Sequence, residues 1–307
     1  MLDEIDLDKK LSKSEYRRRL GIASHRLFDL HRTCWQNDIS AIIAIEGWAG
    51  SRRGRLAESV TERLDPRALR LYHVQPPRTL ERQMPWLRRF WLRIPSYGKM
   101  AIFSGSWYRR VLVDRVEQLV GEEEWRQAYD DIVNFERMLA EDGMAVIKFF
   151  VHISRGKQTK RLHKMHADPL AYGMDRDADW RQLHRRKKYE AAVEEMFDRT
   201  DSEWGPWTVV EGSDRRWATM RVMDTLVHRL SGLLDARGIE VPNHIGSPIT
   251  DESPAINGSP ITDESPAINE SPITDESSAI NESPITDESP ANNESPITNE
   301  SPTPSMP

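Results

Sequence analysis

The chain has 307 residues, enough for one large domain or two ordinary ones, and its 43 basic and 49 acidic side chains give a net charge of −6. Its single cysteine, Cys34, excludes an internal disulfide framework and a cysteine-based zinc site. No apolar run approaches the roughly 20 residues that span a bilayer, and the charged start MLDEIDLDKK lacks the apolar centre of a signal peptide. We therefore expect a cytoplasmic protein that does not contact a membrane.

The charge is divided unevenly along the chain. From Gly246 to the end there are 12 acids and no Lys or Arg, so the net charge of residues 1–245 is about +6. A basic body fits an anionic partner such as a phosphate compound or a nucleotide, although the solvated helix faces of many proteins carry a similar charge. Charge alone therefore leaves the partner open.

Between residues 12 and 238, helix-like and strand-like patterns alternate. Short apolar runs that end in small or polar residues predict strands, and apolar side chains at helical spacing predict helices. In chain order we expect a helix at 12–35, strands at 41–47, 69–74 and 99–105, a helix at 122–143, a strand at 145–154, a helix at 179–200, a strand at 207–212 and a helix at 214–238. This alternation is typical of an α/β fold with a parallel sheet between helix layers, in which ligands bind beyond the carboxyl ends of the strands.

The rest of the chain is an internal repeat of 12 residues. GSPITDESPAIN at 246–257 recurs at 258–269 and then in further altered copies. A proline at nearly every sixth position removes backbone donors, and the segment has no aromatic residue, so it cannot bury a core. We predict a folded domain at residues 1–240 and a disordered, acidic, low-complexity tail at 241–307.

The segment EGWAGSRRGR (46–55) follows the first predicted strand, where a phosphate-binding loop (P-loop) would begin. In the pattern G-x-x-x-x-G-K, the glycines let backbone N–H groups approach phosphates, and the lysine reaches the terminal phosphates. Counted from Gly47, the second glycine and the lysine are replaced by Arg52 and Arg53. The segment thus begins like a phosphate loop and departs from it where phosphate would be bound.

Several short blocks between residues 8 and 235 occur in this order: LSKSEYRRRL, IEGW, LDPR, RFW, IFSGSWYRRVLVDRVE, FFVHIS, KQTKRL, DP and GPWTVVEG. Their order and spacing resemble those of the polyphosphate kinase type 2 family. The resemblance implies a three-layer P-loop-kinase fold and an oligomer. It also implies phosphoryl transfer between inorganic polyphosphate and nucleoside mono- or diphosphates with magnesium. We expect no nucleic-acid partner.

The phosphate loop of that family reads E-G-W-D-A-A-G-K-G and falls without gaps on residues 46–54. This alignment puts Ala49 at the family aspartate, Arg52 at the loop glycine and Arg53 at the lysine. If the glycine position needs a positive φ, an arginine there costs ~1–2 kcal/mol. Arg53 keeps the charge of the lysine but is a planar fork and not a compact ammonium, so the exchange is not conservative.

Two further stretches depart from the family in the same way. The family stretch I-F-D-R-S-W-Y is IFSGSWY here, which puts Ser104 at a second aspartate and Gly105 at the arginine. The family lid pattern D-P-x-K-x-W-K is DPLAYGM, with Ala171, Gly173 and Met174 at the lysine and tryptophan positions. Magnesium needs oxygen ligands, typically one or two carboxylates, so these changes predict impaired catalysis. Each lost contact typically costs ~10²–10³ in rate.

The remaining candidates are a set of cations and two acids. The phosphate-binding candidates are Gly47, Arg52, Arg53, Arg110, Lys157, Lys160 and Arg161. Glu46 and Asp114 are candidates for substitute metal ligands, but each also has an ordinary structural explanation, a hydrogen-bond acceptor for the first and an arginine ion pair for the second. Three functions stay open: an impaired kinase-like protein that binds polyphosphate or nucleotide weakly or joins an active relative as a subunit, an active polyphosphate–nucleotide phosphotransferase with relocated magnesium ligands, and a non-catalytic scaffold.

Overall fold

Five parallel strands form one sheet in the order β2-β3-β1-β4-β5. The strands are β1 (Ala41–Gly47), β2 (Leu69–His73), β3 (Met100–Ser104), β4 (Ala145–His152) and β5 (Trp207–Glu211). The central strand β1 pairs with β3 on one side and with β4 on the other, in registers that begin at Ala41. All five predicted strands are therefore present, and the parallel sheet is confirmed.

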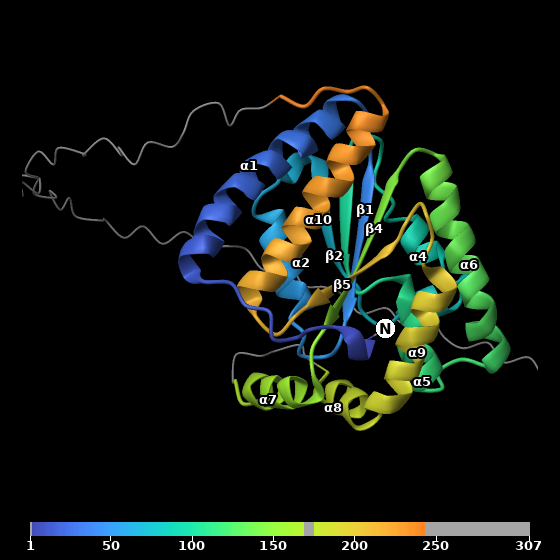
Figure 1. Cartoon of the computed structure of the whole chain (residues 1–307). Helices are drawn as coiled ribbons and strands as arrows, with labels where there is room; N and C mark the ends of the chain where they lie inside the picture. The colour runs from blue at the N-terminus through green and yellow to red at the C-terminus, as the bar shows by residue number, and fades with distance from the viewer. Residues whose placement is uncertain (1, 169–174, 243–307) are drawn as a thin grey trace, which may run out of the picture. The chain divides into compact units, whose positions relative to one another are not determined.

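Helices cover both faces of this sheet, as Figure 1 shows. One face carries α1 (Lys13–Gln36), α2 (Arg53–Thr61) and α10 (Arg215–Ala236), and the other carries α4 (Arg88–Trp91), α6 (Glu122–Glu141) and α9 (Arg186–Thr200). The short elements η1 (Leu2–Glu4), η2 (Pro66–Ala68), α3 (Thr79–Arg82), η3 (Trp107–Arg110) and α5 (Val113–Val116) lie in the connections. The three-layer α/β fold expected from the sequence is confirmed.

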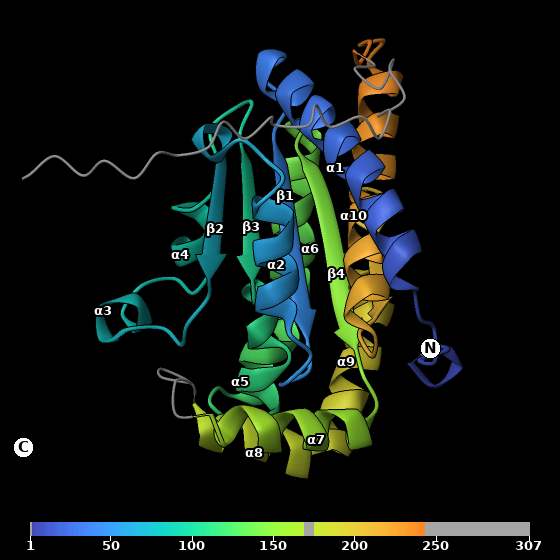
Figure 2. The same ribbon diagram turned by 90° about the vertical axis from the view of Figure 1, so that its left-hand side faces the viewer.

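Two more helices, α7 (Arg155–His166) and α8 (Arg176–His184), lie across the carboxyl ends of the strands (Figure 2). The sequence predicts one helix at 179–200, but the helix is interrupted at Arg185. This residue ends α8 and begins α9, with φ −93° and ψ 17°. The break separates two packing partners. Leu183 packs with Ala49 beyond the carboxyl ends of the strands, whereas Tyr189 belongs to the large hydrophobic core that includes β4 residues.

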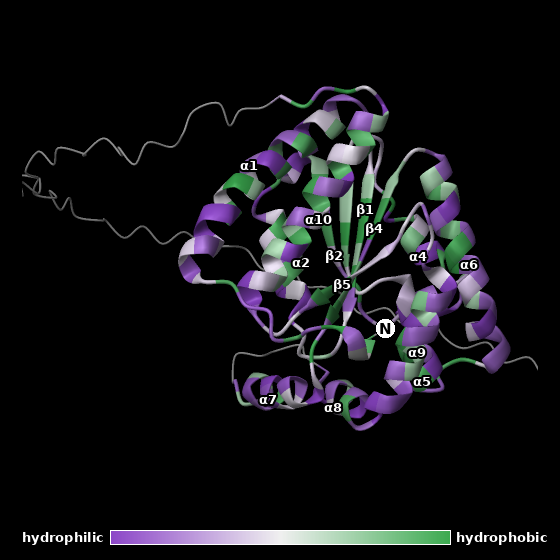
Figure 3. Cartoon of the chain, viewed as in Figure 1, coloured by the Kyte–Doolittle hydropathy of each residue, from purple (hydrophilic) through white to green (hydrophobic). Residues whose placement is uncertain are grey.

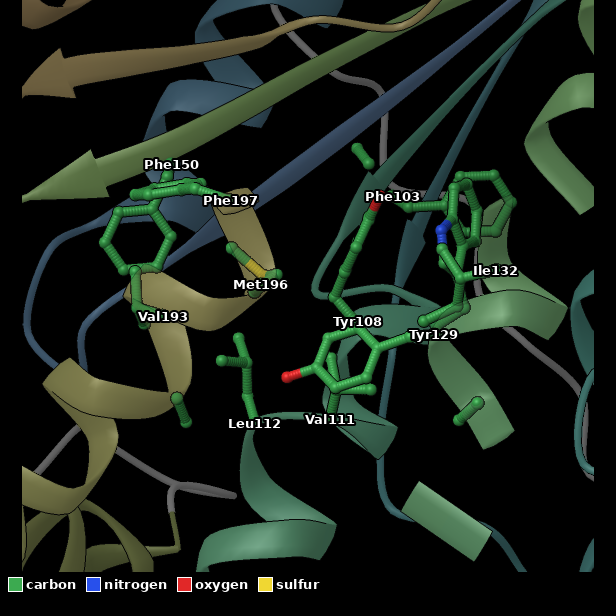
Figure 4. Packing of buried hydrophobic residues seen from close by; sticks show 14 of the residues in the cluster. Phe103, Tyr108, Val111, Leu112, Tyr129, Ile132, Phe150, Val193, Met196 and Phe197 are labelled. Atoms are coloured by element: carbon green, nitrogen blue, oxygen red, sulfur yellow. The ribbon is translucent and has the colours of Figure 1, made fainter. Parts of the chain in front are cut away.

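The strands are buried on both faces, as expected for a parallel sheet between two helix layers. In β1, Ile42 and Ala44 face the α6–α9 side, whereas Ile43 and Ile45 face the α1–α10 side. Figure 3 shows the hydrophobic strands between helices whose outer surfaces are hydrophilic. Figure 4 shows the α6–α9 side, which is rich in aromatic rings, Phe150 among them; its ring meets that of Phe197 edge to face at 5.4 Å.

The α1–α10 side of the sheet contains the cysteine. Cys34 lies on α1 with no exposed surface, among Leu27, Leu30 and the apolar side chains of α10. Burial raises the pKa of its thiol to about 12. The thiol is therefore a packing group and carries no charge at neutral pH.

The computed structural model describes residues 2–168 and 175–242. By its internal contacts the chain divides into two units, Met1–Asp251 and Glu252–Pro307. Nearly all of the predicted tail and the lid positions 171, 173 and 174 lie outside the described residues, so their roles stay predictions. In the part that is described, none of the helices is long and apolar enough to cross a membrane.

Candidate functional site

A cavity of about 300 Å³ lies beyond the carboxyl ends of β1, β2 and β3, where a ligand is expected in such a sheet. The segments that follow these strands form its walls, and α8 and α9 close it. Its charged lining consists of Glu46, Arg53, Arg109, Glu117, Asp175, Asp179 and Arg181. Of the predicted site residues, Glu46, Gly47, Ala49 and Arg53 line this cavity. Gly105, at the position of the family arginine, also lines it. The other described candidates lie outside the lining: Arg52, Ser104, Arg110, Asp114, Lys157, Lys160 and Arg161.

The β1–α2 loop (residues 48–52) has the backbone of a loop that needs glycines. A Cβ on Gly47 would lie 2.7 Å from the carbonyl oxygen of Val151, so a side chain does not fit there. Arg52 begins α2 in the left-handed region, with φ 70° and ψ 30°, and its side chain caps no helix amide. The position of the second glycine therefore does need a positive φ, and the arginine there costs ~1–2 kcal/mol.

Ala49, at the position of the family aspartate, is enclosed by α7 and α8. Its methyl group belongs to a small apolar cluster with Leu162 and Leu183, and only 8% of the residue is exposed. Its backbone N–H donates to the side-chain oxygen of Gln182, with 2.6 Å between nitrogen and oxygen. Neither the side chain nor the amide of this residue is free to bind a ligand in this conformation.

Two of the arginines predicted to bind phosphate donate hydrogen bonds to backbone carbonyl groups. Arg53 donates to the carbonyl oxygen of Gly47 at 3.2 Å and projects into the cavity. Arg161 donates to the carbonyls of Gly50 and Ser51 and to those of residues 212 and 213, at 2.8–3.4 Å. Burial, reinforced by Arg52, lowers the pKa of Arg161 to about 10. Its bonds tie the β1–α2 loop to the segment after β5.

The other predicted cations lie away from the cavity. Arg110 pairs with Glu124 at 3.0 Å and lies over the ring of Trp86. Lys157 and Lys160 are exposed on α7, outside the cavity lining. They are available to a long anion that follows the outside of the molecule, and less suited to a ligand held within the cavity.

Glu46 is buried beside the cavity and is held by its neighbours. Ser106 donates its hydroxyl to Oε1 of Glu46 at 2.7 Å. Burial raises the pKa of Glu46, although the guanidinium of Arg53 and the Ser106 hydrogen bond oppose this shift. The protonated form that burial favours is a poor ligand for a cation.

Asp114 has the structural role that the sequence left open. Its carboxylate pairs with Arg109 at 3.1 Å and with Arg110 at 4.0 Å. Arg115, the next residue along the chain, pairs with Glu195 at 2.6 Å and not with Asp114. Burial raises the pKa of Asp114 despite the two arginines.

Ser104 ends β3 and is buried, with its hydroxyl close to the start of α2. The next residue, Gly105, has φ 77° and donates its N–H to the carbonyl of Ile45 at 3.0 Å. The family arginine would have to adopt this left-handed conformation, at a cost of ~1–2 kcal/mol. The glycine is therefore suited to the turn as it is built here.

The residues around the cavity do not fit the magnesium site that the resemblance implies. Among the described residues, no group of three or more His, Cys, Asp or Glu side chains could hold a metal ion. Ala49 has no donor atom, and Ser104 offers a neutral hydroxyl outside the cavity lining. Glu46 is the one predicted substitute at the cavity, and its carboxyl already accepts from Ser106. These residues therefore support no catalytic step through a metal ion.

The sequence did not point to Gln182, Gln158 or Arg186, although they hold α7–α9 against the β1–α2 loop. No spacing links Gln182 to Ala49, because 133 residues separate them. A weaker signal existed for Lys148, a charge inside the apolar run AVIKFFVHIS, which is fully buried in β4.

The family model for polyphosphate kinase 2 (PPK2) matches residues 10–236 of the chain. The chain belongs to this family. A polyphosphate:AMP phosphotransferase from Pseudomonas syringae pv. tomato is 36% identical over 226 residues, which are 74% of this chain and 45% of that protein. The chain thus spans about half the length of this relative.

Solved structures agree with this assignment. A structure from Pseudomonas aeruginosa, assigned to polyphosphate kinase 2, superposes with a TM-score of 0.73 at 34% identity, over 76% of this chain and 50% of that chain. Polyphosphate kinase 2 from Arthrobacter aurescens superposes with a TM-score of 0.72 over 79% of this chain and 88% of that chain. At 23% identity, the second likeness concerns the fold alone. The PPK2 fold is therefore kept around the altered loop.

Proposed function

We propose that this PPK2-family chain binds polyphosphate or nucleotide weakly and is impaired in phosphoryl transfer. The observation that carries the proposal is the state of Ala49. Its side chain has no carboxylate, and its amide is bonded to Gln182. The position therefore supplies neither a ligand for a cation nor a free donor for phosphate.

Physical requirements of phosphoryl transfer support the same conclusion. The reaction depends on positioning, on metal ions between phosphate oxygens and on cations near the developing charge. The two family aspartates are Ala49 and Ser104 here, and the loop lysine is Arg53. If each lost contact costs ~10²–10³ in rate, the combined loss is several factors of ten.

A second candidate is a subunit that assembles with an active relative. The observation that favours it is the hydrophobic core, which is complete on both faces of the sheet although Ala49 and Ser104 replace the family aspartates. In this alternative the chain supplies a fold for assembly, and its partner supplies the chemistry. An active phosphotransferase with relocated ligands is less well supported, because Glu46 and Asp114 are both engaged by neighbours.

The test is phosphoryl transfer from long-chain polyphosphate to ADP, GDP and AMP with Mg²⁺. The unmodified chain is compared with a variant that carries Ala49→Asp, Arg52→Gly, Arg53→Lys and Ser104→Asp. Gly105 stays unchanged, because its φ of 77° disfavours a side chain. We expect no turnover by the unmodified chain and measurable turnover by the variant.

A matched control carries Ser14→Asp and Arg88→Lys, two exposed positions outside the cavity lining. It should behave like the unmodified chain. Turnover by the unmodified chain would show that the proposed loss of phosphoryl transfer is wrong. Turnover only after mixing with an active relative, above that of the relative alone, would favour the subunit role.

A further inference from the structure

A backbone N–H group of the β1–α2 loop already donates to a side-chain oxygen of the same chain. Oε1 of Gln182, on α8, accepts the N–H of Ala49 at 2.6 Å. In phosphate-binding loops, backbone N–H groups of this kind bind phosphate oxygens. An amide oxygen is an acceptor of similar size, so Gln182 and a phosphate cannot both take this donor.

Gln182 is held in place by a chain of hydrogen bonds. Nε2 of Gln158, which is fully buried on α7, donates to the same Gln182 oxygen at 3.1 Å. Oε1 of Gln158 accepts from Arg186 at 2.7 Å, and Arg186 also donates to the carbonyl of Ile153 at 2.9 Å. The guanidinium of Arg186 lies 3.5 Å from the ring centre of Trp48, in the loop itself. The contact thus connects α7, α8 and α9 with the loop.

The apolar packing next to this hydrogen bond matches the altered loop. Ala49 packs with Leu162 and Leu183, which are at most 5% exposed. An aspartate at position 49 would place a carboxylate beside two leucines, which is unfavourable unless the charge is paired. The closed position of α7 and α8 is therefore compatible with alanine and poorly compatible with the family residue.

We propose that Gln182 is a built-in competitor that keeps phosphoryl ligands from the β1–α2 loop. A phosphate gains the Ala49 amide only when α8 withdraws the glutamine oxygen. The apparent affinity then equals the affinity of the free loop multiplied by the fraction of molecules in which the loop is free. This inference rests on the proposed function in one respect, namely that the ligand is a polyphosphate or nucleotide phosphate.

The test measures binding of inorganic tripolyphosphate by titration calorimetry to the full chain and to Gln182→Leu. Leucine removes the acceptor and leaves the half-buried position filled. Because one hydrogen bond is removed from the closed state, we expect the affinity to rise about three- to tenfold. Gln182→Glu keeps an acceptor, and its affinity should not exceed that of the unmodified chain. Gln127→Leu, an exposed glutamine on α6, should bind like the unmodified chain.

Hydrogen exchange of the segment 47–53 gives a second readout that needs no ligand. We expect faster exchange in Gln182→Leu and unchanged exchange in Gln127→Leu. Equal affinities of Gln182→Leu and the unmodified chain, or faster exchange without tighter binding, would overturn the inference. Polyphosphate turnover by the unmodified chain would refute the impairment proposed above, while the affinity series would still decide the role of Gln182.

Discussion

The turn after β3 and the loop after β1 border the same cavity, yet their side chains are satisfied to different degrees. In the turn, Ser106 donates to Glu46, while Trp107 and Tyr108 donate to Glu136 at 2.9 and 2.8 Å. In the β1–α2 loop, Arg52 is held at a positive φ, and the buried hydroxyl of Ser51 has no partner among the described residues. The groups that support the core are thus kept, whereas those that would touch phosphate are strained or replaced.

The largest expected effect comes from removing a group that supports the core, at the buried ion pair in the aromatic core. Nζ of Lys148 donates to Glu136 at 2.8 Å and to the carbonyl of Thr200 at 2.6 Å, and both charged side chains are at most 1% exposed. Lys148→Met leaves the buried carboxyl group of Glu136 without its cationic partner. We expect a loss of about 3–5 kcal/mol in the free energy of unfolding, measured with urea.

The control for this variant is Arg126→Met, which removes the exposed ion pair with Glu122. It should cost about 0.5 kcal/mol or less. Adding Glu136→Leu to Lys148→Met should recover much of the loss, because both charges are then gone. A loss below about 1 kcal/mol in the single variant would contradict the idea that the two side chains are paired in the core.

A smaller effect is expected from Glu46, where the two regions meet. Its pKa in the folded chain is raised from 4.5, chiefly by burial, so folding favours the protonated carboxyl. That contribution is complete below pH 4.5 and is lost as the pH rises through the raised pKa. Glu46→Gln should therefore gain stability relative to the unmodified chain as the pH rises, by about 1.4 kcal/mol per unit of pKa shift.

Urea unfolding at a series of pH values from about 4 to 8 measures this difference. Ser106→Ala serves as the companion variant, because it removes the hydroxyl that opposes the shift. Its stability should fall more steeply with pH than that of the unmodified chain. A stability difference between Glu46→Gln and the unmodified chain that does not change with pH would rule out the raised pKa.

The smallest effect concerns the strained residue of the β1–α2 loop. Arg52→Gly should raise the free energy of unfolding by about 1 kcal/mol, because glycine adopts φ 70° without strain. Arg55→Gly, three residues further on in α2, should lower it by about 1 kcal/mol, because glycine is a poor helix former. Thermal or urea unfolding measures both. Equal losses in the two variants would mean that position 52 is not strained.

The fold was predictable because its signals are local. The run AIIAIEG predicts β1 at 41–47, where the structure has it, and the pattern around Phe135 predicts α6. The same reasoning missed the break at Arg185, because the helical pattern continues through it, and only packing of Leu183 against the loop separates the two helices. The altered loop positions could be read from the sequence, but the bond from Ala49 to Gln182 could not, since it depends on how distant elements fold together.

The buried cysteine makes this protein convenient for spectroscopy. Cys34 has no exposed surface, and a pKa of about 12 keeps its thiol protonated, so electrophilic reagents that react with thiolates should not modify it. A cysteine introduced at an exposed site, such as His184 on α8 or Arg55 on α2, would then be the one reactive thiol in each variant. A pair of such sites would accept two dyes, and energy transfer between them would report the distance between α8 and α2 without any change to the native cysteine.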